Sequence, residues 1–163
     1  MPIERPPLLC LGGEEAFAAY KAEFDRLYRA GPVLDVLGQL VLFRSEDCRH
    51  VCYKEHRDDV YKTGPRGVWK QARAERIPWI YSALTDPRTE VRTDRERAGD
   101  LLYLCIFDGE PQEPYCVAVH KSGKSEGFFM SAYPVSNQKG HPDWSKDGWQ
   151  KKRRKGPVIW PPK

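Results

Sequence analysis

Histidine, arginine and lysine residues gather in this chain at spacings that suit proton transfer beside a phosphate group. The densest segment, 45–57, contains His50 and His56 together with two cysteines and three cations. Histidine titrates near neutral pH, so each of the two is a candidate general base. Arginine and lysine stabilise phosphate charge, and arginine does so through a two-pronged contact. The candidates for that role are Lys54, Arg57, Arg66, Arg73 and Arg76.

Ser131 and Tyr133 are the hydroxyl side chains that fit such a site. They stand two residues apart in the segment 127–133, which we expect to be a strand, so both side chains should point the same way. A hydroxyl pair on one strand is common. It becomes informative only in combination with a histidine and the arginines.

Cys48, His50, Cys52 and His56 also invite a zinc interpretation, because these residue types are zinc ligands. Their spacing differs from that of structural zinc sites, in which a close cysteine pair is followed by a second pair well downstream. If the segment is extended, three ligands this close together would strain a tetrahedral geometry. We therefore expect two buried cysteines that flank a functional histidine, with no bound metal and no other cofactor.

Motifs of several other reaction classes are missing from the sequence. There is no Walker-type glycine loop and no Gly-x-Ser-x-Gly elbow, and the segment 120–124 lacks the required glycine pattern. The expected core strands carry no Asp/Glu cluster suited to a two-metal nuclease. Metal-independent RNA cleavage is the chemistry that these residues can serve.

The segment 73–87 must position the arginines. A proline inside a helix removes one hydrogen bond and clashes with the preceding turn, so Pro78 should divide this region into two short helices. We expect them near 66–76 and 77–85, with Arg73 and Arg76 on one face of the first helix. The second helix has an apolar face and should end before Asp86-Pro87.

The other elements indicate an α+β domain, in which N-terminal helices pack on a small antiparallel sheet of about four strands. A helix over 14–30 carries an aromatic stripe, which belongs either to the core or to a docking surface. The segments expected to form strands are 38–43, 89–92, 101–107, 115–120 and 127–133.

The chain of 163 residues divides into an N-terminal arm and helix (1–37), a catalytic domain (38–136) and a basic tail with proline and tryptophan (137–163). The net charge is +4, and the run 151–155 alone supplies five positive charges, so the rest of the chain is near neutral. We expect the tail to be dispensable for folding and to add RNA affinity.

The cysteine count and the lack of long apolar runs bear on location. Five cysteines and no signal peptide favour reduced thiols and a cytoplasmic protein. No apolar run approaches membrane-spanning length, so we expect no membrane partner.

In order along the chain, the segments 50–54, 73–80 with Asp86-Pro87, and 131–134 resemble the phage-associated branch of the barnase/EndoU/colicin/RelE-like (BECR) ribonuclease superfamily. The resemblance covers about residues 40–135. It implies helices followed by a four-stranded antiparallel sheet, and a small ribonuclease toxin or effector that needs no metal. The substrate would be RNA, such as tRNA or mRNA, and a cognate immunity or antitoxin protein would be the partner.

The resemblance also implies roles for individual residues. His50 would be the general base, with His56 as its competitor, and Arg73, supported by Arg76, would hold the scissile phosphate. Ser131 would supply the last-strand hydroxyl, with Tyr133 on the same face. The reaction would be transesterification by the ribose 2′-OH, which leaves a 2′,3′-cyclic phosphate.

Three alternatives stay open at this point. A non-catalytic nucleic-acid-binding module would use the same arginines with Trp69 and Trp79 as stacking surfaces. A small interaction or inhibitor protein would dock a partner through the helix at 14–30. A zinc-binding module would use the cysteines and histidines of 48–56.

Overall fold

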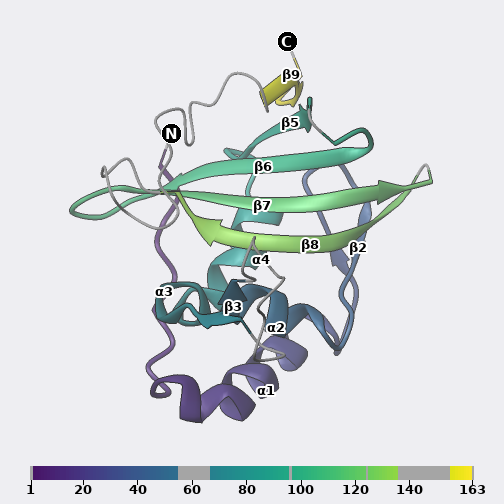
Figure 1. Cartoon of the computed structure of the whole chain (residues 1–163). Helices are drawn as coiled ribbons and strands as arrows, with labels where there is room; N and C mark the ends of the chain where they lie inside the picture. The colour runs from purple at the N-terminus through teal and green to yellow at the C-terminus, as the bar shows by residue number, and fades with distance from the viewer. Residues whose placement is uncertain (1, 55–66, 96, 124, 136–154, 163) are drawn as a thin grey trace.

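The computed structural model describes residues 2–54, 67–95, 97–123, 125–135 and 155–162, and its main feature is a curled sheet that encloses a buried helix (Figure 1). The seven strands of this sheet have the order β1-β2-β8-β7-β6-β5-β9. Four of them are long: β5 (Glu90–Asp94), β6 (Asp100–Phe107), β7 (Glu113–Ser122) and β8 (Glu126–Pro134). The others are β1 (Val33–Leu34), β2 (Leu40–Leu42) and β9 (Lys155–Trp160).

The expected fold of helices on a four-stranded antiparallel sheet is wrong. The strands β5 to β8 do form an antiparallel meander, but β2 joins the edge of β8 in parallel orientation, and β1 and β9 extend the sheet on its two sides. The result is a mixed α/β fold with a seven-stranded sheet. Strands of two or three residues carry too few positions for alternation to reveal them, which is why β1 was missed.

Four α-helices and one short 3₁₀ turn lie among the described residues. They are η1 (Glu14–Ala16), α1 (Phe17–Tyr28), α2 (Asp47–Cys52), α3 (Gln71–Glu75) and α4 (Ile77–Thr85). Helix α4 packs against β6 and β7 on one side and against α1 on the other (Figure 1). The longest of these helices, α1, has twelve residues, and none in the described part of the chain has the length and apolar character needed to cross a membrane.

The break at Pro78 is confirmed, but the first helix is shorter than expected. α3 ends at Glu75 and α4 begins at Ile77, so Pro78 lies in the first turn of α4. Backbone N–H groups in a first turn have no acceptor within the helix, so the proline costs no hydrogen bond there. The expected helical start is instead a strand, β4 (Val68–Trp69), which pairs with β3 (Tyr53–Lys54). The Trp69 ring stacks edge-on against Tyr53 at 5.2 Å, and this contact outweighs the local helical pattern.

The aromatic stripe of α1 belongs to the core. Tyr20, Phe24 and Tyr28 are buried, and the Tyr28 hydroxyl donates to the Ile77 carbonyl oxygen at 2.5 Å. The interpretation of this stripe as a docking surface is therefore wrong, because α4 and the sheet already cover it.

The end of the chain is not an independent tail. β9 pairs antiparallel with β5, and the indole N–H of Trp160 donates to the Pro87 carbonyl at 3.1 Å. The Gly156 carbonyl accepts from the Arg92 guanidinium at 3.1 Å. Residues 155–160 are thus part of the sheet, whereas Trp144, Trp149 and the basic positions 151–154 lie outside the described residues.

Candidate functional site

The meander β5–β8 has two faces with different neighbours. Tyr103, Val117 and Phe129 point into the main core around α4. Leu102, Leu104 and Cys116 point the opposite way and form a second, smaller apolar cluster. We call this second side the outer face. Its members on β6, β7 and β8 include Asp100, Leu102, Leu104, Cys116, Ala118, His120, Phe128, Ser131 and Tyr133.

A bulge in β8 places Ser131 and Tyr133 on the outer face. Ala118 pairs with Ser131, but the next residue, Val119, pairs with Phe129, so Met130 is an extra residue in β8. A shift of one residue moves every following side chain to the other face of a strand. Ser131 and Tyr133 therefore lie opposite Ala118 and Cys116 on the outer face, and the prediction that they point the same way is confirmed.

His120 and Asp100 form a hydrogen-bonded pair on the same face. They are direct cross-strand partners, and Nδ1 of His120 lies 2.6 Å from Oδ1 of Asp100. The carboxylate side chain is only 8% exposed and the imidazole is 48% exposed, so the pair has one buried and one accessible member. An ionised carboxylate accepts from Nδ1–H, which leaves the other ring nitrogen to accept a proton.

Gly99 allows this pair to form at the start of β6. Its φ of +87° is a left-handed conformation that L side chains rarely adopt, and its carbonyl accepts from the Lys121 N–H at 2.8 Å. A Cβ built at Gly99 would lie 3.4 Å from Cε1 of His120. The glycine therefore turns the chain into β6 while leaving room for the imidazole ring.

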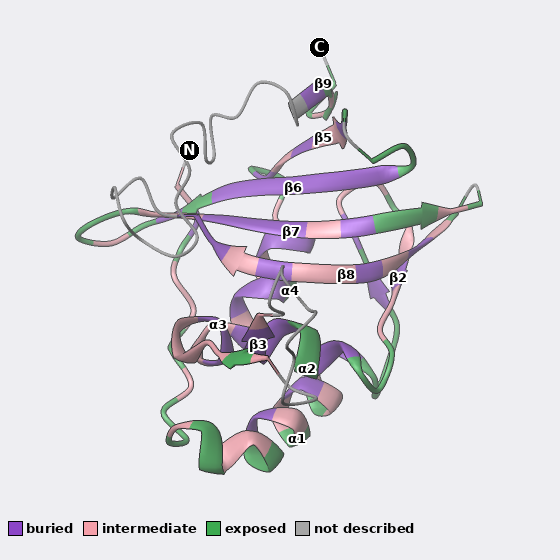
Figure 2. Cartoon of the chain, in the orientation of Figure 1, coloured by how far each residue is buried: buried purple, intermediate pink, exposed green. Residues whose placement is uncertain are grey.

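His120 is close to the predicted hydroxyl pair. It stands two residues beyond Ala118, the partner of Ser131, on the same face. Such diagonal neighbours are about 7 to 8 Å apart. The C-terminal end of β7, which carries His120, is exposed, whereas β6 beside it is buried along most of its length (Figure 2).

Arg73 reaches the other end of this row of residues. The helix α3 packs against β8, and the guanidinium carbon of Arg73 lies 5.3 Å from the centre of the Tyr133 ring. Arg73 is 7% exposed, so its positive charge is held close to the sheet. The outer face thus carries the His120 imidazole on β7 and the hydroxyls of Ser131 and Tyr133 on β8, and the guanidinium of Arg73 contacts the Tyr133 ring from α3, whose neighbour Ala74 is in the main core.

His50 lies apart from this arrangement. It is exposed on α2, where Cys48 and Cys52 occupy the buried side with their sulfur atoms 3.9 Å apart. Within the described residues, His50 has no side-chain hydrogen bond to Arg73 or Ser131. Because the segment is helical and not extended, residues 48 and 52 share one side of α2 and residue 50 faces another.

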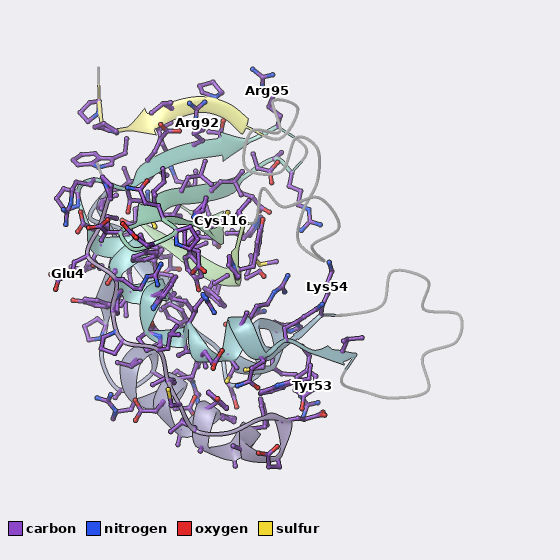
Figure 3. All side chains as sticks on the ribbon, turned by 90° about the vertical axis from the view of Figure 1, so that its left-hand side faces the viewer. Glu4, Tyr53, Lys54, Arg92, Arg95 and Cys116 are labelled. Carbon is purple, nitrogen blue, oxygen red and sulfur yellow. The ribbon has the colours of Figure 1, made fainter. Side chains whose placement is uncertain are left out.

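Lys54 lies on the side of β3 that faces the sheet. Tyr53 points toward α1, where its hydroxyl donates to Glu14 at 2.9 Å and its ring contacts Phe17. Successive strand residues point in opposite directions, and Lys54 accordingly extends toward the sheet in Figure 3. His56, Arg57 and Arg66 lie outside the described residues.

Arg76 has a structural role that differs from the predicted one. Its guanidinium donates twice to the Glu113 carboxylate, at 2.7 and 2.8 Å, and once to the Ala72 carbonyl at 2.9 Å. It also lies 4.8 Å from the centre of the Trp79 ring. The guanidinium N–H groups that would bind a phosphate already donate to Glu113 and to Ala72. Arg76 is therefore no longer our candidate for a phosphate ligand.

The two tryptophans considered for base stacking are engaged in packing. Trp79 is fully buried, and its indole N–H donates to the Pro6 carbonyl at 2.9 Å. Trp69 packs between Tyr20 and Tyr53 and donates to Gln71 at 2.8 Å. Trp79 is therefore inaccessible to a nucleobase, and Trp69 is partly covered by its aromatic neighbours.

Sequence reasoning missed His120 and Asp100, although a signal for them exists. The turn expected at Asp108-Gly109 centres the hairpin near residue 110. Positions 100 and 120 lie equally far from that centre, so they face one another across the hairpin. A histidine opposite an aspartate at such positions predicts an oriented imidazole.

Comparisons with protein-family models, with curated proteins and with solved structures find no match for this chain. In the part of the chain that the structure describes, no three His, Cys, Asp or Glu side chains cluster in a way that could hold a metal ion.

Proposed function

We propose that this protein is an endoribonuclease that cleaves RNA without a metal ion, through attack of a ribose 2′-OH on the adjacent phosphate. The observation that carries the proposal is the His120–Asp100 pair, 2.6 Å apart, on the same sheet face as Ser131 and Tyr133. Arg73 adds a positive charge against Tyr133. The resemblance of segments 50–54, 73–80 and 131–134 to BECR ribonucleases supports the same chemistry.

His120 is the general base of this mechanism, in place of His50. Its free ring nitrogen takes the proton from the 2′-OH, and the oxygen then forms a bond to phosphorus while the bond to the 5′-oxygen breaks. Asp100 is a positioning residue that holds the ring and stabilises the imidazolium. The products are a 2′,3′-cyclic phosphate and a 5′-hydroxyl.

Charge on the phosphoryl oxygens is stabilised from the other end of β8. Arg73 supplies positive charge, and the hydroxyl of Ser131 on β8 donates a hydrogen bond to a phosphoryl oxygen. The leaving 5′-oxygen takes a proton from a general acid. Solvent water can supply this proton, because the His120 side of the site is exposed.

The experiment that tests the proposal is incubation of the purified protein with total RNA in excess EDTA, followed by analysis of the product ends. We expect fragments that end in a 2′,3′-cyclic phosphate and begin with a 5′-hydroxyl. A model strand with a single ribose should be cut only at that position, and a fully 2′-O-methyl strand should stay intact. Cleavage that stops in EDTA, or binding without any cleavage, would contradict the proposed mechanism.

The cellular setting of this function is the cytoplasm, where RNA substrates and reduced thiols coexist. All five cysteines are free thiols, and four of them are buried. A ribonuclease in this compartment requires control, so a protein inhibitor that covers the outer face is the partner we expect.

A further inference from the structure

The His120–Asp100 pair continues across the sheet into an apolar surface. In register, Asp100 lies opposite His120, His120 opposite Phe128, and Phe128 beside Leu42 of the parallel strand β2. One row on the outer face therefore contains a carboxylate, an imidazole, a phenyl ring and an isobutyl group on four adjacent strands. Asp100 and His120 form the polar half of this row, and Phe128 and Leu42 form the apolar half.

The orientation of Phe128 follows from its neighbour. A Cβ built on Gly127 would lie 2.7 Å from Cγ1 of Val119, a core residue, so position 127 faces the core. Phe128 must then face the outer side, next to His120. It is half-buried, and among the described residues it packs against neither of the two hydrophobic clusters.

We propose that Phe128 is a base-stacking platform that makes the enzyme selective for single-stranded RNA, an inference that rests on the proposed ribonuclease function. When His120 approaches a ribose 2′-OH, the nucleobase of an adjacent nucleotide reaches the phenyl ring beside it. Leu42 extends the apolar surface under that base. A base in a duplex is already stacked and paired, so only an unpaired strand has a base free to stack on Phe128.

Stacking on Phe128 predicts a particular kind of selectivity. Every base has a π-face, so affinity should depend weakly on base identity and strongly on the presence of a base. Arg73, at the far end of β8, contributes by charge and should be felt in the salt dependence of binding. The two contributions can therefore be separated experimentally.

The test measures binding of a fluorescein-labelled, fully 2′-O-methyl single strand, which cannot be cleaved, together with cleavage of the matching strand that has one ribose. An abasic residue is placed in turn on each side of the ribose position. The variants are Phe128→Ala, Phe128→Trp as the conservative replacement, and Tyr81→Leu as a matched control, because Tyr81 is an exposed aromatic residue on α4.

We expect Phe128→Ala to weaken binding about 10- to 100-fold, Phe128→Trp to restore it, and Tyr81→Leu to leave it unchanged. An abasic residue at one position should weaken binding to the wild type by the same factor and have no further effect in Phe128→Ala. Annealing the complementary strand should also abolish the difference between the wild type and Phe128→Ala.

Additive losses from the abasic residue and from Phe128→Ala would overturn the stacking assignment, as would unchanged binding by Phe128→Ala. Cleavage with additive losses leaves the ribonuclease proposal intact and removes only this inference. Coupled losses without cleavage retain the stacking site and remove the catalytic proposal. No binding to any strand overturns both.

Discussion

His120 and His50, the two histidines among the described residues, differ in what orients their rings. His120 has a buried carboxylate 2.6 Å from Nδ1, so its ring has one preferred orientation and one preferred tautomer. His50 is exposed on α2, and among the described residues no carboxylate is hydrogen-bonded to its ring, although Asp47 on the same helix interacts with it electrostatically. A general base must be held in position, which favours His120 for that role.

We predict that His120→Gln lowers kcat for RNA cleavage by about 100- to 10,000-fold, because a positioned base contributes that much. Asp100→Asn should lower kcat with little change in KM, since Asp100 acts through the histidine and not on the substrate. His50→Gln serves as the matched variant, and its loss should be smaller than that of His120→Gln. Single-turnover cleavage of the one-ribose strand measures all three.

The opposite order would reassign the base to His50. Equal activity of all three variants and the wild type would remove histidine from the mechanism. Circular dichroism and thermal unfolding of each variant establish that a loss of cleavage is not a loss of fold, because His120 is half exposed and its replacement leaves both hydrophobic clusters intact.

At the level of elements, the bulge in β8 determines which side chains the site receives. Phe129 and Ala132 both lie in the main core although they are three residues apart, which regular alternation does not allow. The extra residue, Met130, makes this arrangement possible and turns Ser131 and Tyr133 outward. One insertion in a strand thus serves the core and the outer face together.

β9 is the element whose contribution to stability is most open to test. A Cβ at Gly156 would lie 2.1 Å from Oγ1 and 2.8 Å from the carbonyl oxygen of Thr93 on β5, so the two strands approach too closely for a side chain. We predict that Gly156→Ala lowers the free energy of unfolding by about 1 to 3 kcal/mol. A chain that ends at residue 154 should lose more, because the packing of the partly buried Trp160 against the core is also lost.

Urea titration followed by tryptophan fluorescence measures these differences. Ile159→Thr is the control, because Ile159 is exposed on the same strand and should change stability by less than about 0.5 kcal/mol. An unchanged midpoint for the shortened chain would restore the original expectation that the end of the chain is dispensable for folding.

For the molecule as a whole, the reactivity of the buried cysteines measures whether the chain unfolds in one cooperative transition. Cys48 and Cys52 lie on α2, Cys105 on β6 and Cys116 on β7, and all four are buried. The neighbouring Cys48 thiol, together with burial, raises the pKa of Cys52 well above its usual range, and burial does the same for the pKa of Cys105. Cys10 is exposed.

We predict that a thiol reagent such as DTNB modifies one cysteine per folded chain at neutral pH, because Cys10 is exposed and the other four cysteines are buried. Cys10→Ser should reduce this number to zero. In urea, the other four should become reactive in one transition that coincides with the loss of tryptophan fluorescence. Early reaction of Cys116 alone would show that the outer face opens separately from the main core.

Local physical rules were sufficient for much of this architecture. The break at Pro78, the apolar helix after it and the aromatic face of α1 follow from proline geometry and helical periodicity. Apolar runs bounded by turn residues located the three central strands, and alternation placed Ser131 and Tyr133 on one face. These properties depend on residues within a few positions of each other, so the sequence alone determines them.

Pairing between distant segments was decided only by the tertiary structure. Four contacts join residues that are tens of positions apart in the sequence. They are the pairing of β2 with β8, the pairing of β9 with β5, the contact of Arg73 with Tyr133 and the ion pair of Arg76 with Glu113. The His120–Asp100 pair requires the register of the β6–β7 hairpin, and the outward turn of Ser131 requires the bulge at Met130. Periodicity gives the faces of each element, but register and packing between elements select which faces meet, and the site is made at that level.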